Sequence, residues 1–206
     1  MRKFTIGIIL IMISGCMAKT ETISNEDPYE SINKPIFKFN RKFDTAILKP
    51  IALSYQTITP KPLSKCISHA FLNLSEVNTV ANDLFQLRVV FALEDLWRLA
   101  INSTLGIGGC IDIANKFNLP RRSQSFASTL KTWGVKNGSF IIIPFIGAST
   151  TTNMFGLPLK YYIFDPVRFL DNYQAAVQTL RIVDKKVQLL PLDAALANAF
   201  DPYVLY

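Results

Sequence analysis

Apolar residues recur every three or four positions between residues 32 and 47, which is the repeat of one helical face. Asp27 and Pro28 precede this segment as a predicted N-cap and first-turn proline, and Pro35 is expected to kink or delay the helix. The apolar face carries Ile32, Ile36, Phe39, Phe43, Ala46 and Ile47, and the opposite face carries Lys34, Lys38, Arg41 and Lys42. The pattern fits two structures equally well. One is a basic amphipathic helix in a membrane interface, with Ile36, Phe39, Phe43 and Ile47 against lipid, and the other is an ordinary surface helix.

A second helical pattern covers residues 88–104, after two shorter helices predicted near 63–73 and 76–86. Its strongly polar residues gather within about a third of the helical circumference, and they are Arg88, Glu94, Asp95, Arg98 and Asn102. The default interpretation is a helix surrounded by protein, with Glu94 and Arg98 paired at i,i+4. The alternative is a helix with lipid on its broad side and a channel on its narrow side, lined by Arg88, Asp95, Arg98 and Asn102.

Glycine and proline divide the remaining sequence. Gly106, Gly108 and Gly109 end the second helix as a C-cap and tight turn, without the spacing of a phosphate-binding loop. Residues 118–125 form a basic loop, and the apolar run 140–146 is an extended segment or hairpin, since Pro144 excludes a central strand. Asp165-Pro166 begins a further helix, whose apolar stripe is expected to pack on the domain and comprises Phe169, Tyr173, Ala176, Leu180, Val183, Val187 and Leu190. Asp201-Pro202 opens one more.

The chain begins with the features of an export signal. Arg2 and Lys3 precede an apolar run over residues 4–13, which is too short to span a bilayer. Ser14 and Gly15 then lead into Cys16, as in the bacterial lipobox. We therefore predict a signal peptide over residues 1–15, lipid attachment at Cys16 and a tether over residues 16–26.

The hydropathy of the chain says more about its surroundings than its net charge does. The net charge is +7, half the residues are apolar and the mean hydropathy is +0.24. Yet no stretch after the signal approaches the roughly 20 apolar residues of a spanning helix. The surplus apolar surface therefore predicts contact with one membrane leaflet. Nucleic acid is excluded as a partner outside the cytoplasm.

The residues carry little catalytic chemistry. His69 is the single histidine, no serine elbow accompanies it, and no Cys/His cluster has metal-ligand spacing, so neither an enzyme nor a metal protein is predicted. Cys66 and Cys110 are either two small buried apolar side chains or a bridge, and the first interpretation is favoured.

Several spaced motifs resemble the MlaA/VacJ family of outer-membrane lipoproteins. The resemblance runs over residues 27–203, and its pieces include Asp27-Pro28-Tyr29-Glu30, Phe39-Asn40, Asn73-Leu74-Ser75-Glu76, Gly106-Ile107-Gly108-Gly109, Trp133-Gly134-Val135 and Asp201-Pro202-Tyr203. Val77, Thr152 and Asn153 depart from the usual pattern. The helix and tail that follow the Asp201-Pro202-Tyr203 motif in the family are missing, which implies a shortened C-terminus for the domain 27–206.

The resemblance implies a mainly α fold, a ring-like bundle of amphipathic helices in the inner leaflet of the outer membrane, with a short apolar hairpin. It implies a non-enzymatic function without cofactor. Phospholipid that has strayed into the outer leaflet would pass through the protein, beside a porin trimer, to a soluble periplasmic carrier that feeds an inner-membrane ABC-type complex. The alternative function is an envelope lipoprotein that scaffolds a porin complex without moving lipid.

Overall fold

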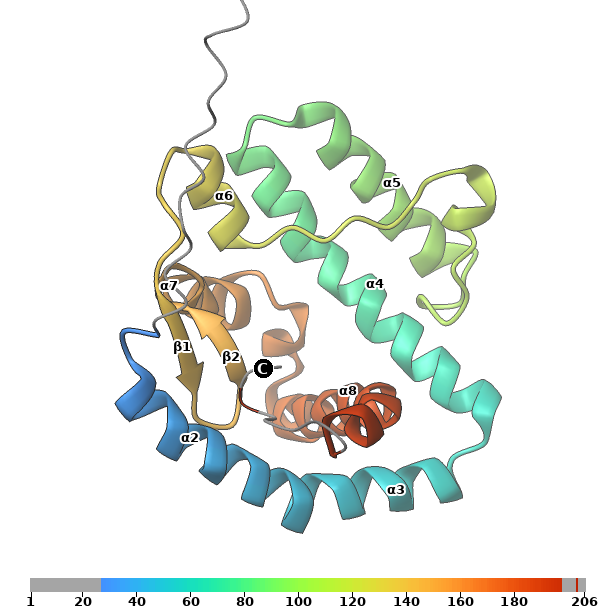
Figure 1. Cartoon of the computed structure of the whole chain (residues 1–206). Helices are drawn as coiled ribbons and strands as arrows, with labels where there is room; N and C mark the ends of the chain where they lie inside the picture. The colour runs from blue at the N-terminus through green and yellow to red at the C-terminus, as the bar shows by residue number, and fades with distance from the viewer. Residues whose placement is uncertain (1–26, 198–202, 204–206) are drawn as a thin grey trace, which may run out of the picture.

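The fold begins with a long curved helical arm. A computed structural model describes residues 27–197 and Tyr203, and helix labels follow Figure 1. Helix α2 (Glu30–Phe43) continues through a π-helical turn (Asp44–Leu48) into α3 (Lys49–Ile58). Helix α4 (Lys61–Phe85) then crosses the molecule, and α5 (Val89–Thr104) folds back beside it.

The second half of the chain returns to the arm and completes a ring-like arrangement (Figure 1). Its elements are a 3-10 turn (Ala114–Phe117), α6 (Phe126–Thr132), β1 (Phe140–Ile143), β2 (Gly147–Thr150), α7 (Thr151–Pro158), a π-helical turn (Leu159–Ile163), a 3-10 helix (Pro166–Tyr173) and α8 (Gln174–Ala197). The mainly α, ring-like fold with a small hairpin is confirmed. Among the helices the structure describes, none combines the length and hydropathy needed to cross a membrane.

Several predicted boundaries need correction. The helices expected near residues 63–73 and 76–86 are one helix, α4, because nothing between them breaks the helical repeat. Helix α2 runs through Pro35 and begins at Glu30 with Tyr29 as its cap, so the prediction of Asp27 as N-cap is wrong. Asp27 instead accepts the backbone N–H of Tyr29 at 2.9 Å within the preceding turn, which also holds Pro28. The predicted signal peptide, lipidated Cys16, tether and Asp201-Pro202 helix start lie outside the described residues.

The apolar run 140–146 lies in a hairpin, which is one of the two structures that the sequence predicted for it. Strands β1 and β2 pair antiparallel from Phe140 opposite Thr150 to Ile143 opposite Gly147. Pro144 lies in the connecting turn, where its missing N–H costs no strand hydrogen bond. Gly147 has φ of 102°, a conformation that glycine adopts without strain.

Two asparagines of α2 fasten this hairpin to the helical arm. Asn33, fully buried, accepts the N–H of Ile142 at 2.8 Å and donates to the carbonyl of Phe140 at 3.3 Å. Seven residues further along α2, Asn40 accepts the N–H of Phe145 at 2.8 Å and donates to the carbonyl of Ile143 at 3.0 Å. The amides thus satisfy backbone groups that a two-stranded sheet leaves unpaired.

The interior is more polar than the exterior. Among the described residues, fifteen polar or charged side chains are buried and only six apolar ones are, three of which are alanines. Large apolar side chains are exposed on nearly every element, with Leu87 at 85% and Trp97 at 64%. This distribution is the reverse of that in a water-soluble domain, whose buried positions are mainly apolar.

The predicted stripe on the last helix is divided. Asp171 has φ of 38° and breaks the helical path between the 3-10 helix and α8, so the seven positions do not share one face. Phe169 and Tyr173 are exposed, whereas Val183 is buried. The prediction that the whole stripe packs on the domain is therefore wrong for its first part.

Asn33→Ala is expected to lower the free energy of unfolding by about 1–3 kcal/mol, because two buried backbone groups lose their partner. Urea unfolding of the protein purified in detergent measures the change. The control is Asn137→Ala at an exposed loop position, which should unfold like wild type. Equal midpoints for the two variants would show that the asparagine does not hold the hairpin.

Candidate functional site

The buried polar residues of α4 and α5 form two stripes that face each other. On α4 the stripe contains Asn73, Glu76, Thr79, Asn82, Asp83 and, just beyond the helix, Gln86, and on α5 it contains Asp95, Arg98 and Asn102. The spacing of three and four residues keeps each stripe on one side of its helix. The narrow polar face of α5 is therefore turned toward protein, and the broad apolar arc is turned outward.

Arg98 is the centre of the first polar cluster. Its Nη2 lies 3.2 Å from either carboxylate oxygen of Asp112, its Nε lies 3.5 Å from Oε1 of Glu76, and its Nη1 donates to the carbonyl of Leu119. Asn102 donates to Asp112 at 3.0 Å and accepts the N–H of Ala114 at 2.9 Å. One guanidinium thus joins two helices and the loop that follows them.

Arg121 joins the same cluster from the basic loop. Its Nε lies 3.3 Å from Oε1 of Glu76, and its Nη2 donates to the hydroxyl of Ser75 at 2.8 Å. Burial raises the pKa of Glu76, although Arg121 and Arg98 act in the opposite direction. Both charges of the loop's arginine pair, Arg121 and Arg122, therefore point back to the helices.

A small cavity of about 70 Å³ lies inside this cluster. Arg98 and Asn102 border it, together with Asn73, Glu76 and His69. Asp95 and Arg88, the other two predicted channel residues, do not border it.

These two residues belong to a second cluster toward the C-terminal end of α4. Asp95 and Asp83 are both fully buried, and Arg122 lies 3.0 Å from Oδ1 of Asp95. Arg88 is half-buried and lies 3.6 Å from Asp83. Burial, with Asp95 alongside, raises the pKa of Asp83 from 3.8 to about 6. The expected pair of Glu94 and Arg98 is wrong, because Glu94 pairs with Arg122 at 2.6 Å.

The glycine turn is packed closely against α4 at Gly109 and against its own chain at Gly106. A Cβ at Gly109 would come within 2.6 Å of the side chain of Asn73, and one at Gly106 within 2.3 Å of the carbonyl of Ile111. Gly108 has open space around it but a φ of 66°. The predicted tight turn is confirmed, but the C-cap of α5 is Leu105 and not one of the glycines. Close packing accounts for Gly106 and Gly109, and the positive φ accounts for Gly108.

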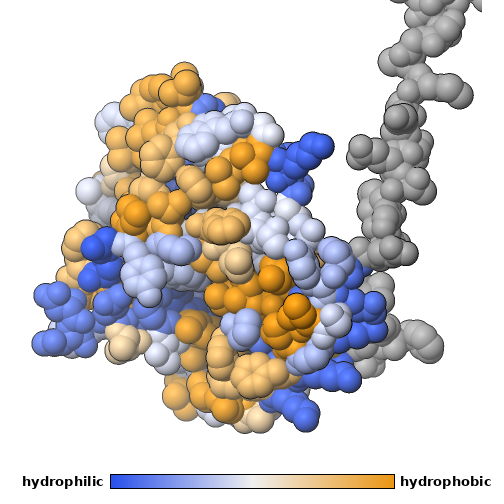
Figure 2. Space-filling model, turned by 90° about the vertical axis from the view of Figure 1, so that its left-hand side faces the viewer, coloured by the Kyte–Doolittle hydropathy of each residue, from blue (hydrophilic) through white to orange (hydrophobic). Residues whose placement is uncertain are grey.

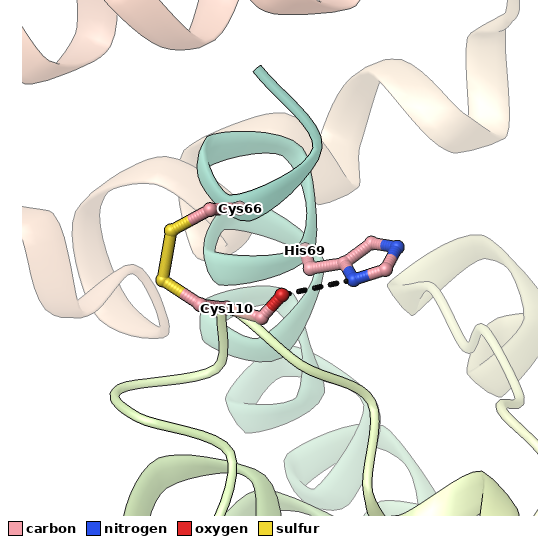
Figure 3. The surroundings of a disulfide bond; sticks show 3 residues. All are labelled: Cys66, His69 and Cys110. Atoms are coloured by element: carbon pink, nitrogen blue, oxygen red, sulfur yellow. Dashed lines mark hydrogen bonds between the residues drawn. A yellow bond between two sulfur atoms is a disulfide. The ribbon is translucent and has the colours of Figure 1, made fainter. Parts of the chain in front are cut away.

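A disulfide fastens the same turn to α4 (Figure 3). Cys66 and Cys110 are bonded, so the favoured expectation of two separate thiols is wrong. One helical turn along α4, Nδ1 of His69 donates to the carbonyl of Cys110 at 3.1 Å. His69 thus supports the turn, and among the described residues no hydroxyl group hydrogen-bonds to it, as a nucleophile–base pair would require.

The predicted lipid-contact residues are placed around an aromatic cluster on the helical arm. Phe39 is 46% exposed, and its ring lies 5.1 Å from that of Phe145 at the hairpin tip; Phe43, half-buried, lies 5.0 Å from the same ring. Ile47 is exposed and Ile36 is half-buried. Figure 2 shows that apolar side chains, interrupted by polar patches, cover much of the molecular side that carries the hairpin.

Sequence reasoning missed two apolar features. The first is the α4–α5 connection, where Leu87 is exposed with φ of 57°. The second is an open groove of about 540 Å³ between α3 and α8, bordered by Ile51, Ile58, Leu180 and Val183. A local hydropathy pattern gives the apolar residues of each helix but not which faces enclose a groove.

Reduction of the disulfide is expected to lower the free energy of unfolding by about 3–4 kcal/mol, because the bond closes a loop of 44 residues in the unfolded chain. Thermal melting with and without a reductant measures the loss. The double variant Cys66→Ser/Cys110→Ser is the control. With or without the reductant, it should melt at the temperature at which the reduced wild-type protein melts. A reductant-insensitive wild type would contradict this.

Asp83 should make stability depend on pH. Its pKa is higher in the folded protein, so the folded state holds a proton that the unfolded chain releases first, and the free energy of unfolding falls as pH rises from 3.8 to about 6. Asp83→Asn keeps the shape and removes the titration. Urea midpoints across this pH window should fall less steeply for the variant, and parallel curves would contradict the assignment.

Comparisons with known proteins agree with this architecture. The family model for the MlaA lipoprotein matches residues 25–206. A protein of Rickettsia felis is 33% identical over 181 residues, covering 86% of this chain and 72% of that relative. The intermembrane phospholipid transport system lipoprotein MlaA of Escherichia coli K12 is 28% identical over 214 residues, covering 100% of this chain and 84% of the relative.

A solved structure has the same fold. It comes from work on the structural basis for maintenance of bacterial outer membrane lipid asymmetry, and it superposes with a TM-score of 0.73 at 28% identity. The match covers 87% of this chain and 92% of that one. With the family match extending over nearly the whole chain, we conclude that this protein belongs to the MlaA lipoprotein family.

Proposed function

We propose that the protein is anchored by lipid on Cys16, sits in the inner leaflet of the outer membrane, and removes phospholipid that has strayed into the outer leaflet. It passes this lipid to a soluble periplasmic carrier that feeds an inner-membrane ABC-type complex, and a porin trimer is its partner in the membrane. The reaction moves a molecule without changing a covalent bond, so no catalytic residue or cofactor is needed.

The observation that carries this proposal is the reversed polarity of the fold. Fifteen polar side chains are buried while Leu87, Trp97 and other large apolar side chains are exposed. An apolar exterior of this extent is unfavourable in water, and acyl chains provide the solvent that it needs. A polar interior supplies the complementary environment for headgroups.

The lipid-contact surface follows from the same distribution. Phe39, Phe43 and Ile47 on the helical arm and the hairpin tip at Phe145 would rest among acyl chains, as would the outward arc of α5. Lys38 and Lys42 on the other face of the arm suit anionic headgroups. The arm thus lies along the leaflet rather than across it.

The interior offers separate environments for the two parts of a phospholipid. The apolar groove between α3 and α8 is wide enough and apolar enough for acyl chains. Arg98 and Asn102 border the polar cavity and are the channel-lining candidates that the geometry favours. In the second cluster, Arg88 pairs with Asp83 of α4, and Asp95 of α5 pairs with Arg122 of the basic loop.

Phe39→Asp is the direct test. A carboxylate among acyl chains costs up to about 2.5–3.5 kcal/mol, so the arm should leave the leaflet and phospholipid should accumulate on the cell surface. Surface phospholipid is measured by its hydrolysis when phospholipase is added to intact cells that carry the variant as their sole copy. Gln56→Asp, an exposed polar position on α3, is the control and should behave like wild type.

Lipid extracted from the purified wild-type protein separates transport from scaffolding. A transport protein should co-purify with stoichiometric phospholipid, whereas a scaffold of a porin complex should carry none. Wild-type surface lipid in the Phe39→Asp strain, at normal protein levels, would overturn the proposed membrane placement.

A further inference from the structure

The cavity between α4, α5 and the glycine turn contains hydrogen-bond acceptors that nothing in the described structure satisfies. Oε2 of Glu76 and Oδ1 of Asn73 are buried and have no hydrogen-bond partner there, although their residues are 1% and 5% exposed. Buried acceptors of this kind are rare, because each unpaired one costs free energy. Both residues border the cavity, so a group inside it can reach them.

The orientation of both side chains is fixed by their other contacts. The amide nitrogen of Asn73 donates to the hydroxyl of Ser103 at 2.9 Å, which leaves its Oδ1 to the cavity. Oε1 of Glu76 is held by Arg98 and Arg121, which leaves its Oε2. His69 also borders the cavity and donates through Nδ1 to the carbonyl of Cys110, which leaves Nε2 as an acceptor when the ring carries a single proton.

Charge and size narrow the choice of occupant. Oε2 of Glu76 and Oδ1 of Asn73 lack a donor, and a carboxylate oxygen accepts more strongly from a charged N–H group than from a neutral one. Arg98 and Asp112 also border the cavity, where they pair with each other. The volume of about 70 Å³ accommodates several waters or a group of a few heavy atoms. Arg121 borders the same cavity, and although its Nε and Nη2 contact α4, 32% of its side chain is exposed.

We propose that this cavity receives the primary ammonium group of an ethanolamine-type headgroup, with the phosphodiester of the same headgroup beside Arg121. The inference rests on the proposed transport function and gives it a substrate preference. Three N–H groups match the acceptors on Glu76, Asn73 and His69. A choline headgroup has no N–H to donate and carries three methyl groups in their place.

The first test uses the wild-type chain and a graded series of ligands. The full chain in detergent is titrated with short-chain phosphatidylethanolamine, its N-methyl and N,N-dimethyl derivatives, and phosphatidylcholine. Affinity should fall with each methyl group, by about tenfold or more over the series, since each step removes a charge-assisted hydrogen bond. Equal affinities across the series would overturn the inference, leave transport intact and assign the cavity to water.

A second arm separates the headgroup from the rest of the lipid. Phosphoethanolamine and phosphocholine, which lack acyl chains, are titrated in the same way. Tighter binding of phosphoethanolamine supports the cavity site even where neither phospholipid binds, and that result would contradict the transport function alone. Equal binding of the two soluble compounds counts against the site.

A variant pair assigns the effect to Glu76. Glu76→Gln keeps the shape of the side chain and should reduce the preference for ethanolamine over choline to within a few-fold. Glu94→Gln makes the same chemical change on α5 outside the cavity, and it should keep the wild-type preference. An unchanged preference in a folded Glu76→Gln protein would overturn the assignment, and the wild-type methyl series decides the case if that variant does not fold.

Discussion

A guanidinium group enclosed between two helices must find its counter-charges within the protein. For this reason Arg98 sets the arrangement of α4, α5 and the loop that follows them. Its partners come from three parts of the chain: Glu76 on α4, Asp112 after the glycine turn, and the carbonyl of Leu119 in the basic loop. These pieces have to meet at one point before the charge is satisfied. Replacement by apolar residues could preserve stability, but it would remove the feature that specifies which segments meet.

The same logic extends to the rest of the fold. In acyl surroundings, apolar side chains gain little by moving from lipid into a protein interior, so packing and polar contacts have to select the structure. Asn33 and Asn40 perform this function between α2 and the hairpin, and Asp83, Asp95 and Arg122 perform it between α4, α5 and the loop. In the membrane placement proposed above, the reversed polarity and the dense internal hydrogen bonding are two results of one environment.

The sequence predicted well which face of a helix is polar or apolar, and poorly which residues that face contacts. The polar stripe of α5, the glycine turn and the start of the hairpin at Phe140 follow from local periodicity or from residues with restricted backbones, and the structure has them where expected. The second strand, which extends the hairpin to Thr150, was not predicted. Arg98, however, pairs with residues 14 and more positions away instead of Glu94 on its own helix. A helical period states which way a side chain points but not what lies opposite. For the same reason the division of the α8 stripe and the groove between α3 and α8 escaped prediction.

The covalent link between Cys66 and Cys110 has a consequence for the order of events in the life of the chain. Such bonds form and persist in oxidising compartments and are rare where cellular thiols are kept reduced. On the export route proposed above, therefore, the chain lacks this bond before secretion, when it is easier to unfold and to thread through a translocation pore. Oxidation on the far side then makes folding harder to reverse, so that maturation proceeds in one direction.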